Sequence, residues 1–213
     1  MAQVQKWSKV AVAMQSALAA AVTITGISKA SPAVVTVASS APATGAYVIL
    51  TVQGMTQLNG RVARVTNLTG TTFELEDIDS TAFDTFSSGS FQVVTFGTSI
   101  TTATSISASG GDFDFIDTTT IHDAARTQVP GLANASSFSF DNIWDTADAG
   151  LTAMKAASDT QAQRAFLFTF ASGQIMVFNG YVGASLLPGG QAQGLVTTQT
   201  TITMFGAPTY YAS

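Results

Sequence analysis

The chain has 213 residues, a formal net charge of −5 and no cysteine. The lack of cysteine excludes disulfides, thiolate metal sites and thiol nucleophiles, and the acidic balance argues against a basic groove that holds nucleic acid. Charged residues make up 10% of the chain, against about 25% in an ordinary soluble domain. Because charge is depleted at the centre of protein interfaces, this composition predicts self-association.

The first 22 residues contain two lysines, then an apolar run and small residues, which is the outline of a secretory signal. Gln15 and Ser16 interrupt the apolar run, which is also too short and too polar to span a bilayer. We therefore expect an arm or short helix that docks on a neighbouring subunit, with Trp7 among its contacts.

Residues 23–95 contain short runs of β-branched or aromatic residues separated by Gly, Asn, Ser and Pro, which predict a small all-β, barrel-like module. The expected strands are residues 33–37, 47–52, 61–65, 72–75 and 91–96. Asn59-Gly60 predicts a hairpin or tight loop, because both residues tolerate positive φ.

Residues 96–213 predict a β-sandwich with longer strands and one short α-helix. The expected strands are residues 112–116, 136–140, 164–171, 175–182 and 195–205, with a turn at 171–174. Phe166, Phe168 and Phe170 share one face of a strand, which predicts a place in the core. The helix should be capped by Asp145, run for about three turns and pack through Leu151.

Three segments of this second part resemble the tail tube (major tail) proteins of long-tailed bacteriophages. They are GDFDFIDTTTIHDAARTQVPGL (residues 111–132), NIWDTADAGLTAMKAAS (142–158) and the stretch from RAFLFTF to GAPT (164–209). Both the individual motifs and their order along the chain match the family pattern. The resemblance covers residues of about 96 to 213.

The resemblance implies a structural virion protein and not an enzyme, with no cofactor and no membrane. Its subunits would form six-membered rings that stack into a tube, assembled in the host cytoplasm and carried in the virion tail. Partners would be other copies and the tape measure, tail terminator and tail tip proteins. DNA would pass without specific binding, because an acidic channel offers phosphates no counter-charge. Residues 1–22 would belong to the tube domain.

Residues 27–81 resemble a second known module, the first catalytic-cysteine half-domain of ubiquitin-activating enzymes. GMTQLNGRVARV (residues 54–65) is the most recognisable phrase. Since the chain has no cysteine to accept a thioester, the resemblance implies the fold alone, as a module inserted near the N-terminus.

The single histidine, His122, lies between Asp117, Asp123 and Arg126. A catalytic site would need one of these carboxylates to orient His122 and a nucleophile such as Thr119 or Ser136 within reach. The chain has no GxSxG elbow and no second histidine to support a metal.

Two interpretations of residues 117–134 remain besides catalysis. The segment is a solvated loop, or it is a long loop that reaches the next subunit or ring. In the second case Asp117, His122, Asp123 and Arg126 are candidate contacts, and Pro130-Gly131 turns the chain back.

Other patterns support binding only weakly. Acidic residues alternate with aromatics in DFDF and FELEDID, but neither run matches a calcium loop. Trp7 and Trp144 could stack on a sugar, yet residues so far apart more often anchor a core or an interface. The alternative to a tube subunit is a secreted or surface β-rich module that recognises a glycan or a host receptor.

Overall fold

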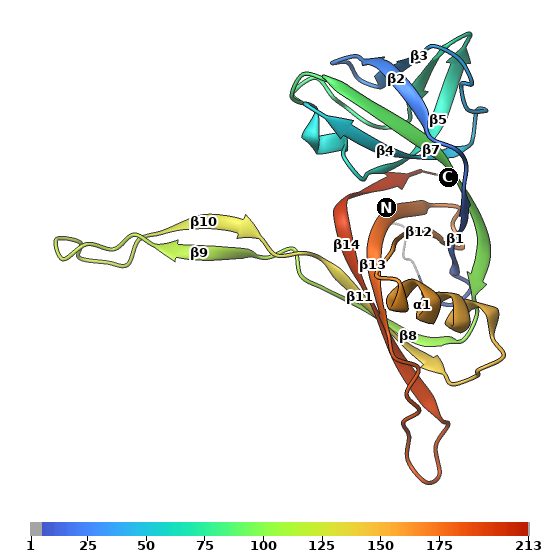
Figure 1. Cartoon of the computed structure of the whole chain (residues 1–213). Coiled ribbons are helices and arrows are strands. Elements are labelled where there is room, and N and C mark those ends of the chain that lie inside the picture. Colours follow the sequence, from blue (N-terminus) through green and yellow to red (C-terminus); the bar gives the residue numbers. More distant parts are fainter. Residues whose placement is uncertain (1–5, 213) are drawn as a thin grey trace.

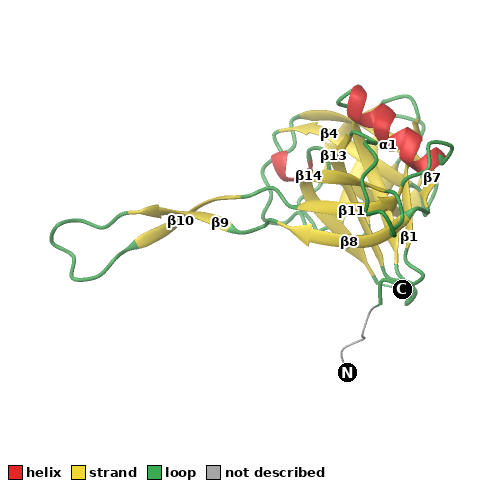
Figure 2. Ribbon diagram, turned by 90° about the horizontal axis from the view of Figure 1, so that it is seen from below, coloured by secondary structure: helices red, strands yellow, loops and turns green. Residues whose placement is uncertain are grey.

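The computed structural model describes residues 6–212, and this part of the chain is mainly β with a single α-helix (Figures 1 and 2). The fold class predicted from the sequence is therefore confirmed. The elements are β1 (Ala11–Leu18), β2 (Val22–Ile27), β3 (Ala33–Val37), β4 (Tyr47–Gln53), the 3₁₀-helix η1 (Thr56–Leu58), β5 (Val62–Thr69), β6 (Thr72–Leu75), β7 (Ser88–Ile100), β8 (Ala103–Ser109), β9 (Phe113–Asp117), β10 (Gln128–Ala133), β11 (Ser137–Ile143), α1 (Ala149–Asp159), β12 (Gln163–Thr169), β13 (Ile175–Ala184) and β14 (Thr197–Tyr211).

Twelve of the described strands form one antiparallel sheet in the order β2-β3-β6-β5-β4-β7-β1-β12-β13-β14-β11-β8. An additional pairing of β2 with β7 closes the first six strands into a barrel, which lies at the top of Figure 1. The other strands curve beneath it and end at β8, whose outer edge has no strand partner within residues 6–212. β9 and β10 form a separate two-stranded ribbon.

The barrel has its own core, built from the alternating apolar residues that the sequence indicates. β3 and β6 alternate buried and half-buried positions along their length, as expected for strands with one face inside. Phe73 and Phe91 meet at the centre with their ring centroids 5.4 Å apart in an edge-to-face arrangement. Both side chains are fully buried.

The second core is built around five buried phenylalanines and one side of α1. Phe166 and Phe168 are fully buried on β12, which lies between β1 and β13, so the predicted central position of this strand is confirmed. The rings in this cluster lie 5.3–6.0 Å apart: Phe138, Phe140, Phe166, Phe168 and Phe178. Leu151 and Met154 of α1 cover them.

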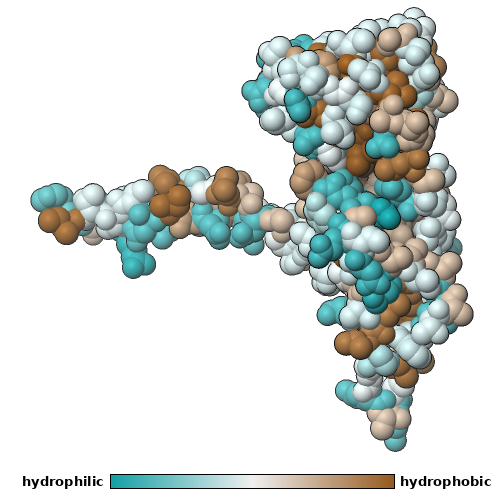
Figure 3. Space-filling view, in the orientation of Figure 1, coloured by the Kyte–Doolittle hydropathy of each residue, from teal (hydrophilic) through white to brown (hydrophobic). Residues whose placement is uncertain are grey.

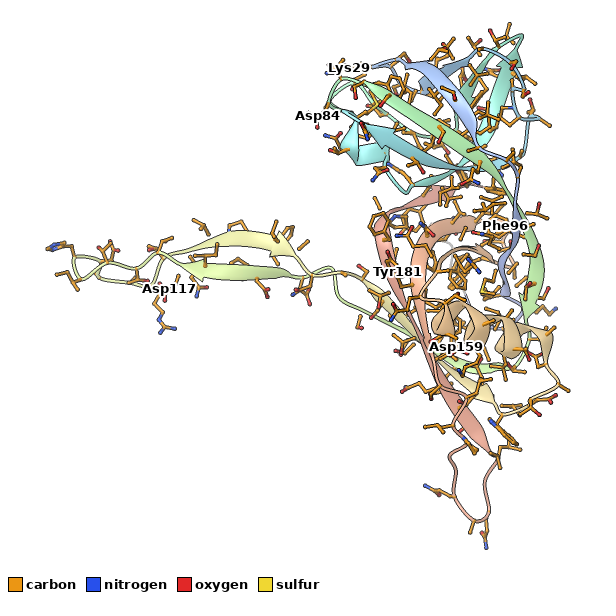
Figure 4. All side chains as sticks on the ribbon, in the orientation of Figure 1. Lys29, Asp84, Phe96, Asp117, Asp159 and Tyr181 are labelled. Atoms are coloured by element: carbon orange, nitrogen blue, oxygen red, sulfur yellow. The ribbon has the colours of Figure 1, made fainter. Side chains whose placement is uncertain are left out.

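A third cluster joins the two cores at the end of β14, near the labelled Phe96 in Figure 4. The backbone N–H of Arg64 in the barrel donates to the hydroxyl of Tyr211 at 2.6 Å, and the Arg64 guanidinium lies 4.5 Å from the centre of that ring. Thr209 donates to the carbonyl of Val62 at 2.9 Å. The last strand of the chain therefore fastens the barrel to the rest of the molecule.

The expected N-terminal arm or helix is wrong for residues 11–18. This segment is strand β1, paired with β7 on one side and β12 on the other. Its alanine, methionine and glutamine residues favour helix on intrinsic propensity, but two neighbouring strands and the burial of Val12 and Met14 override that preference.

Two local predictions change in detail. The N-cap of α1 is Asp148, whose carboxylate accepts from the backbone of Leu151 at 2.8 Å, whereas Asp145 accepts from Ala147 just before the helix. Asn59 is extended and only Gly60 has positive φ, at 73°. With the Arg61 N–H donating to the Leu58 carbonyl, this is a type II turn.

Candidate self-assembly surfaces

The most exposed part of the fold is the arm, which we define as residues 110–135. It continues the β8–β11 pair as the ribbon β9–β10 and projects away from the body in both ribbon views (Figures 1 and 2). The direction changes at Gly110 and Gly111, whose φ angles of 89° and 86° suit only glycine. About ten residues separate this bend from the tip, so the arm reaches about 30 Å.

The expectation of a loop over residues 117–134 is partly wrong, because Gln128–Ala133 is strand β10. Pro130 and Gly131 therefore do not turn the chain back; they lie within β10, and the connection from β9 to β10 runs through residues 118–127. Pro130 lies opposite Phe115 in a ribbon with free edges, where a missing N–H is tolerated.

The arm has almost no core of its own. Two-stranded hairpins are marginal in water without a packed face, yet six large apolar side chains of the arm are exposed: Phe113, Phe115, Ile116, Ile121, Val129 and Leu132. They appear as brown patches along the arm in Figure 3. Phe113 and Phe115 share one face of β9 and are 54% and 63% exposed.

Hydrogen bonds order the connection between β9 and β10, near the labelled Asp117 in Figure 4. Asp117 accepts from the Thr119 backbone and Asp123 accepts from the backbone and hydroxyl of Thr120. The Thr119 side chain and backbone lower the pKa of Asp117, and hydrogen bonding from Thr120 lowers the pKa of Asp123. Both carboxylates are therefore held charged. Arg126 lies 4.0 Å from Asp117 and its side chain is 81% exposed.

This geometry does not assemble a catalytic site around His122. Its backbone N–H donates to Thr120, while its imidazole has no hydrogen-bond partner in the described part of the chain. Asp123 is occupied by Thr120, and Ser136 lies at the other end of the ribbon, beyond β10. Asp117, His122, Asp123 and Arg126 are instead presented together on the exposed end of the arm.

A second projection is the loop 185–196 between β13 and β14, at the bottom of Figure 1. It carries no charged residue, and Leu187, Leu195 and Val196 are exposed. Its base is fixed by Trp144, whose indole N–H donates to the Leu186 carbonyl and whose backbone N–H donates to the Val196 carbonyl, both at 2.9 Å. Trp144 is thus a structural anchor at this position.

A groove of about 410 Å³ lies between the start of β1 and the edge strand β8. Trp7 forms one wall and packs on Phe170 with ring centroids 5.9 Å apart. Ala11, Ala103 and Ile106 contribute to the other walls, and no charged side chain of residues 6–212 lines the groove. Trp7 does not lie near the arm's own charged tip, so the candidate contacts divide into two separate surfaces.

The outer surface of β8, β11 and β14 forms a third feature, which we call the hydroxyl face. Strand register aligns Ser107 with Ser139 and Thr201, and Ser109 with Ser137 and Thr203. The opposite sides of β11 and β14 bury Phe138, Phe140 and Ile202, which directs the hydroxyls away from the core. The face is completed by Ser105, Gln199 and Asp141 and carries no lysine or arginine.

Within residues 6–212, no cluster of three or more histidine, aspartate or glutamate side chains could hold a metal ion. No helix in the same range is long and apolar enough to cross a membrane.

The model of the phage tail tube protein family matches residues 53–213, well over half of the chain. The chain belongs to the phage tail tube protein family. Proteins of this family are structural components of the virion tail and not enzymes, and they assemble into a tube with other tail proteins. No curated protein matches the chain.

Membership of a family that assembles into tubes is consistent with the exposed surfaces of this tail tube protein. Apolar side chains on an arm without a core and an open strand edge are liabilities in a monomer, and contact with another copy is one way to cover them. No sequence signal distinguished β8, since its residues are mostly Ala, Ser and Thr, and the groove beside it was not predicted.

Proposed function

We propose that this protein is the major tail tube subunit, and that its copies form rings, six to a ring, which stack around a channel for DNA. The observation that carries the proposal is the arm: a ribbon that reaches about 30 Å, exposes six large apolar side chains and pairs with no other strand within residues 6–212. Within this account Asp117, His122, Asp123 and Arg126 meet a neighbouring copy, and Trp7 belongs to the surface that receives one.

We propose that the hydroxyl face lines the channel. Four strands per copy (β8, β11, β14 and β13), at a spacing of about 4.8 Å, contribute about 115 Å of circumference in six copies. The channel is therefore at least about 37 Å in diameter, because strand tilt and the spaces between copies widen it. Serine and threonine hydroxyls hold water, and with Asp141 as the single charge the face offers phosphates no cation. DNA would therefore pass without being held.

We also propose a division into a tube domain, residues 1–22 and 96–213, and an inserted module, residues 23–95. The support is the closed six-stranded barrel with its own core, which is formed by the part of the chain whose sequence resembles the ubiquitin-activating half-domain. A channel for DNA needs clearance, so the barrel belongs on the outside of the tube. Assembly in the host cytoplasm and contacts with tape measure, terminator and tip proteins belong to the same proposal.

Labelled cysteines test this arrangement directly, because the chain contains no cysteine of its own. Thr201→Cys carries a heavy-atom cluster on the hydroxyl face, and Leu68→Cys carries it on an exposed position of the barrel. In averaged electron micrographs of tubes, the Thr201 label is expected at the channel and the Leu68 label at the periphery. A Thr201 label at the periphery contradicts the assignment of the channel face.

A charge on the arm tests the contact itself. Arg126 makes one long ion pair at the surface, and such pairs contribute about 0–1 kcal/mol. Arg126→Ala should therefore leave the urea midpoint of the subunit unchanged but lower the yield of tubes. A normal tube yield from this variant counts against a contact at Arg126.

A further inference from the structure

The arm and the groove are each incomplete in a single chain. The groove beside β8 is lined by apolar and small polar side chains, including Trp7, Ala11, Ala103 and Ile106. The arm offers Phe113 and Phe115 on one face of β9, both more than half exposed. Aromatic side chains that fill a pocket at the centre of an interface contribute much of its binding energy.

Charge favours the same match. The arm carries four aspartates and one arginine, a net charge of −3 from residues 112, 114, 117, 123 and 126. Lys6 and Lys9 flank Trp7 in sequence, and neither makes an ion pair within residues 6–212.

Two carboxylates also lie close to the groove, but both are already hydrogen-bonded. Asp148 caps α1 and accepts from Thr101, and Asp141 accepts from Ser105 at 2.6 Å. These hydrogen bonds leave both carboxylates charged, and Lys6 and Lys9 supply the cations beside Trp7, without an ion pair of their own within residues 6–212. Complementary charges steer association and fix its register.

Backbone hydrogen bonding gives a third reason. β8 is the open edge of the twelve-stranded sheet, and both edges of the β9–β10 ribbon are also without a strand partner within the described residues. An extended segment laid along β8 would pair with its free N–H and C=O groups while its alternate side chains enter the groove.

We propose that the groove between β1 and β8 receives the arm of a second copy, with Phe113 and Phe115 in the groove and Lys6 and Lys9 beside the arm's aspartates. The proposal rests on the proposed tube assembly and names the surface that accepts the arm. The arm enters the groove through its phenylalanine face, and the aspartates on the opposite face and at the tip stay at the rim, where water and lysine solvate them.

Disulfide cross-linking between two differently substituted proteins tests this pairing. One protein carries Ala11→Cys, at an exposed position lining the groove, and the other carries Phe115→Cys on the arm. Each has a single cysteine, so a disulfide that joins the two different substitutions must link separate copies. The proteins are mixed under tube-forming conditions, oxidised and separated on a denaturing gel, and tubes are counted by electron microscopy.

Matched partners identify the occupant of the groove. Leu187→Cys places the thiol on the uncharged loop 185–196, and Leu68→Cys places it on the barrel. We expect the Phe115 protein to give several-fold more mixed dimer with Ala11→Cys than either of these. Adding Lys6→Glu and Lys9→Glu to the groove protein should lower that yield.

The outcomes separate this inference from the proposed function. Mixed dimer formed mainly by the Leu187 protein, or no mixed dimer with any partner while tubes form normally, overturns the arm-in-groove pairing and leaves the tube subunit standing. Absence of tubes from the unsubstituted protein at every concentration overturns both.

Discussion

Replacing Tyr211 with phenylalanine should loosen the barrel from the tube domain. The hydroxyl of this buried residue accepts the Arg64 backbone N–H at 2.6 Å, across two segments 147 residues apart. Tyr211→Phe keeps the ring against the Arg64 guanidinium but leaves the N–H without a partner. A buried polar group that loses its hydrogen bond costs about 1–3 kcal/mol.

For a loss of about 2 kcal/mol and a urea dependence of about 2 kcal/mol per molar, the unfolding midpoint should fall by about 1 M. The assay is urea unfolding of the dispersed subunit followed by tyrosine fluorescence and circular dichroism. Tyr210→Phe is the matched control, since Tyr210 is the adjacent residue and its side chain is exposed. Equal midpoints for the two variants would refute the claim that Tyr211 fastens the barrel.

Three further predictions concern the stability of the subunit. Burial raises the pKa of Tyr211, so the folded state keeps its proton above about pH 10, where tyrosine in the unfolded chain loses it. The stability of the wild type should therefore be constant in this respect below about pH 10 and fall as pH rises above it, and the difference in urea midpoint between wild type and Tyr211→Phe should narrow there. Phe168→Ala should cost about 3–5 kcal/mol because the ring is fully buried among three others, whereas Phe170→Ala, at a half-buried site, should cost clearly less in the same assay. Gly150→Ala should lower the thermal midpoint, because the alanine Cβ would lie 2.6 Å from the Ser99 carbonyl oxygen. Alanine favours helix more than glycine does, so a raised midpoint would show that the helix can move away from Ser99.

The parts of the fold that the sequence predicts are those where apolar residues alternate. β3 and β6 begin and end where expected, and the phenylalanines of β12 lie in the core. The turn that joins β12 to β13 is also present, with Gly173 at a φ of 89°. In these segments local pattern and tertiary packing favour the same structure.

Strands without that pattern were missed. β1 is rich in helix-forming residues, and β8 is mostly Ala, Ser and Thr, so both exist because of the strands beside them. β10 contains Pro130 and Gly131, which locally predict a turn. β10 pairs with β9 because the two strands extend the β8–β11 pair. This pairing joins segments that are distant in sequence, so no local pattern predicts it.

The candidate contacts illustrate the same division. Asp117, His122, Asp123 and Arg126 were recognised from an exposed, polar stretch between strands, and the structure places them on the arm. The groove that we propose as the acceptor of the arm's phenylalanine face is built from the start of β1 and from β8. Neither segment was predicted as a strand, so the acceptor surface could not be predicted either.

Electron microscopy of the purified protein across a concentration series shows directly whether its copies form a tube. We expect rings with six-fold symmetry that stack into tubes with an open channel, and averaged images should show the barrels around the outside. Dispersed monomers at every concentration, even with a tail initiator complex supplied as a seed, would contradict this expectation.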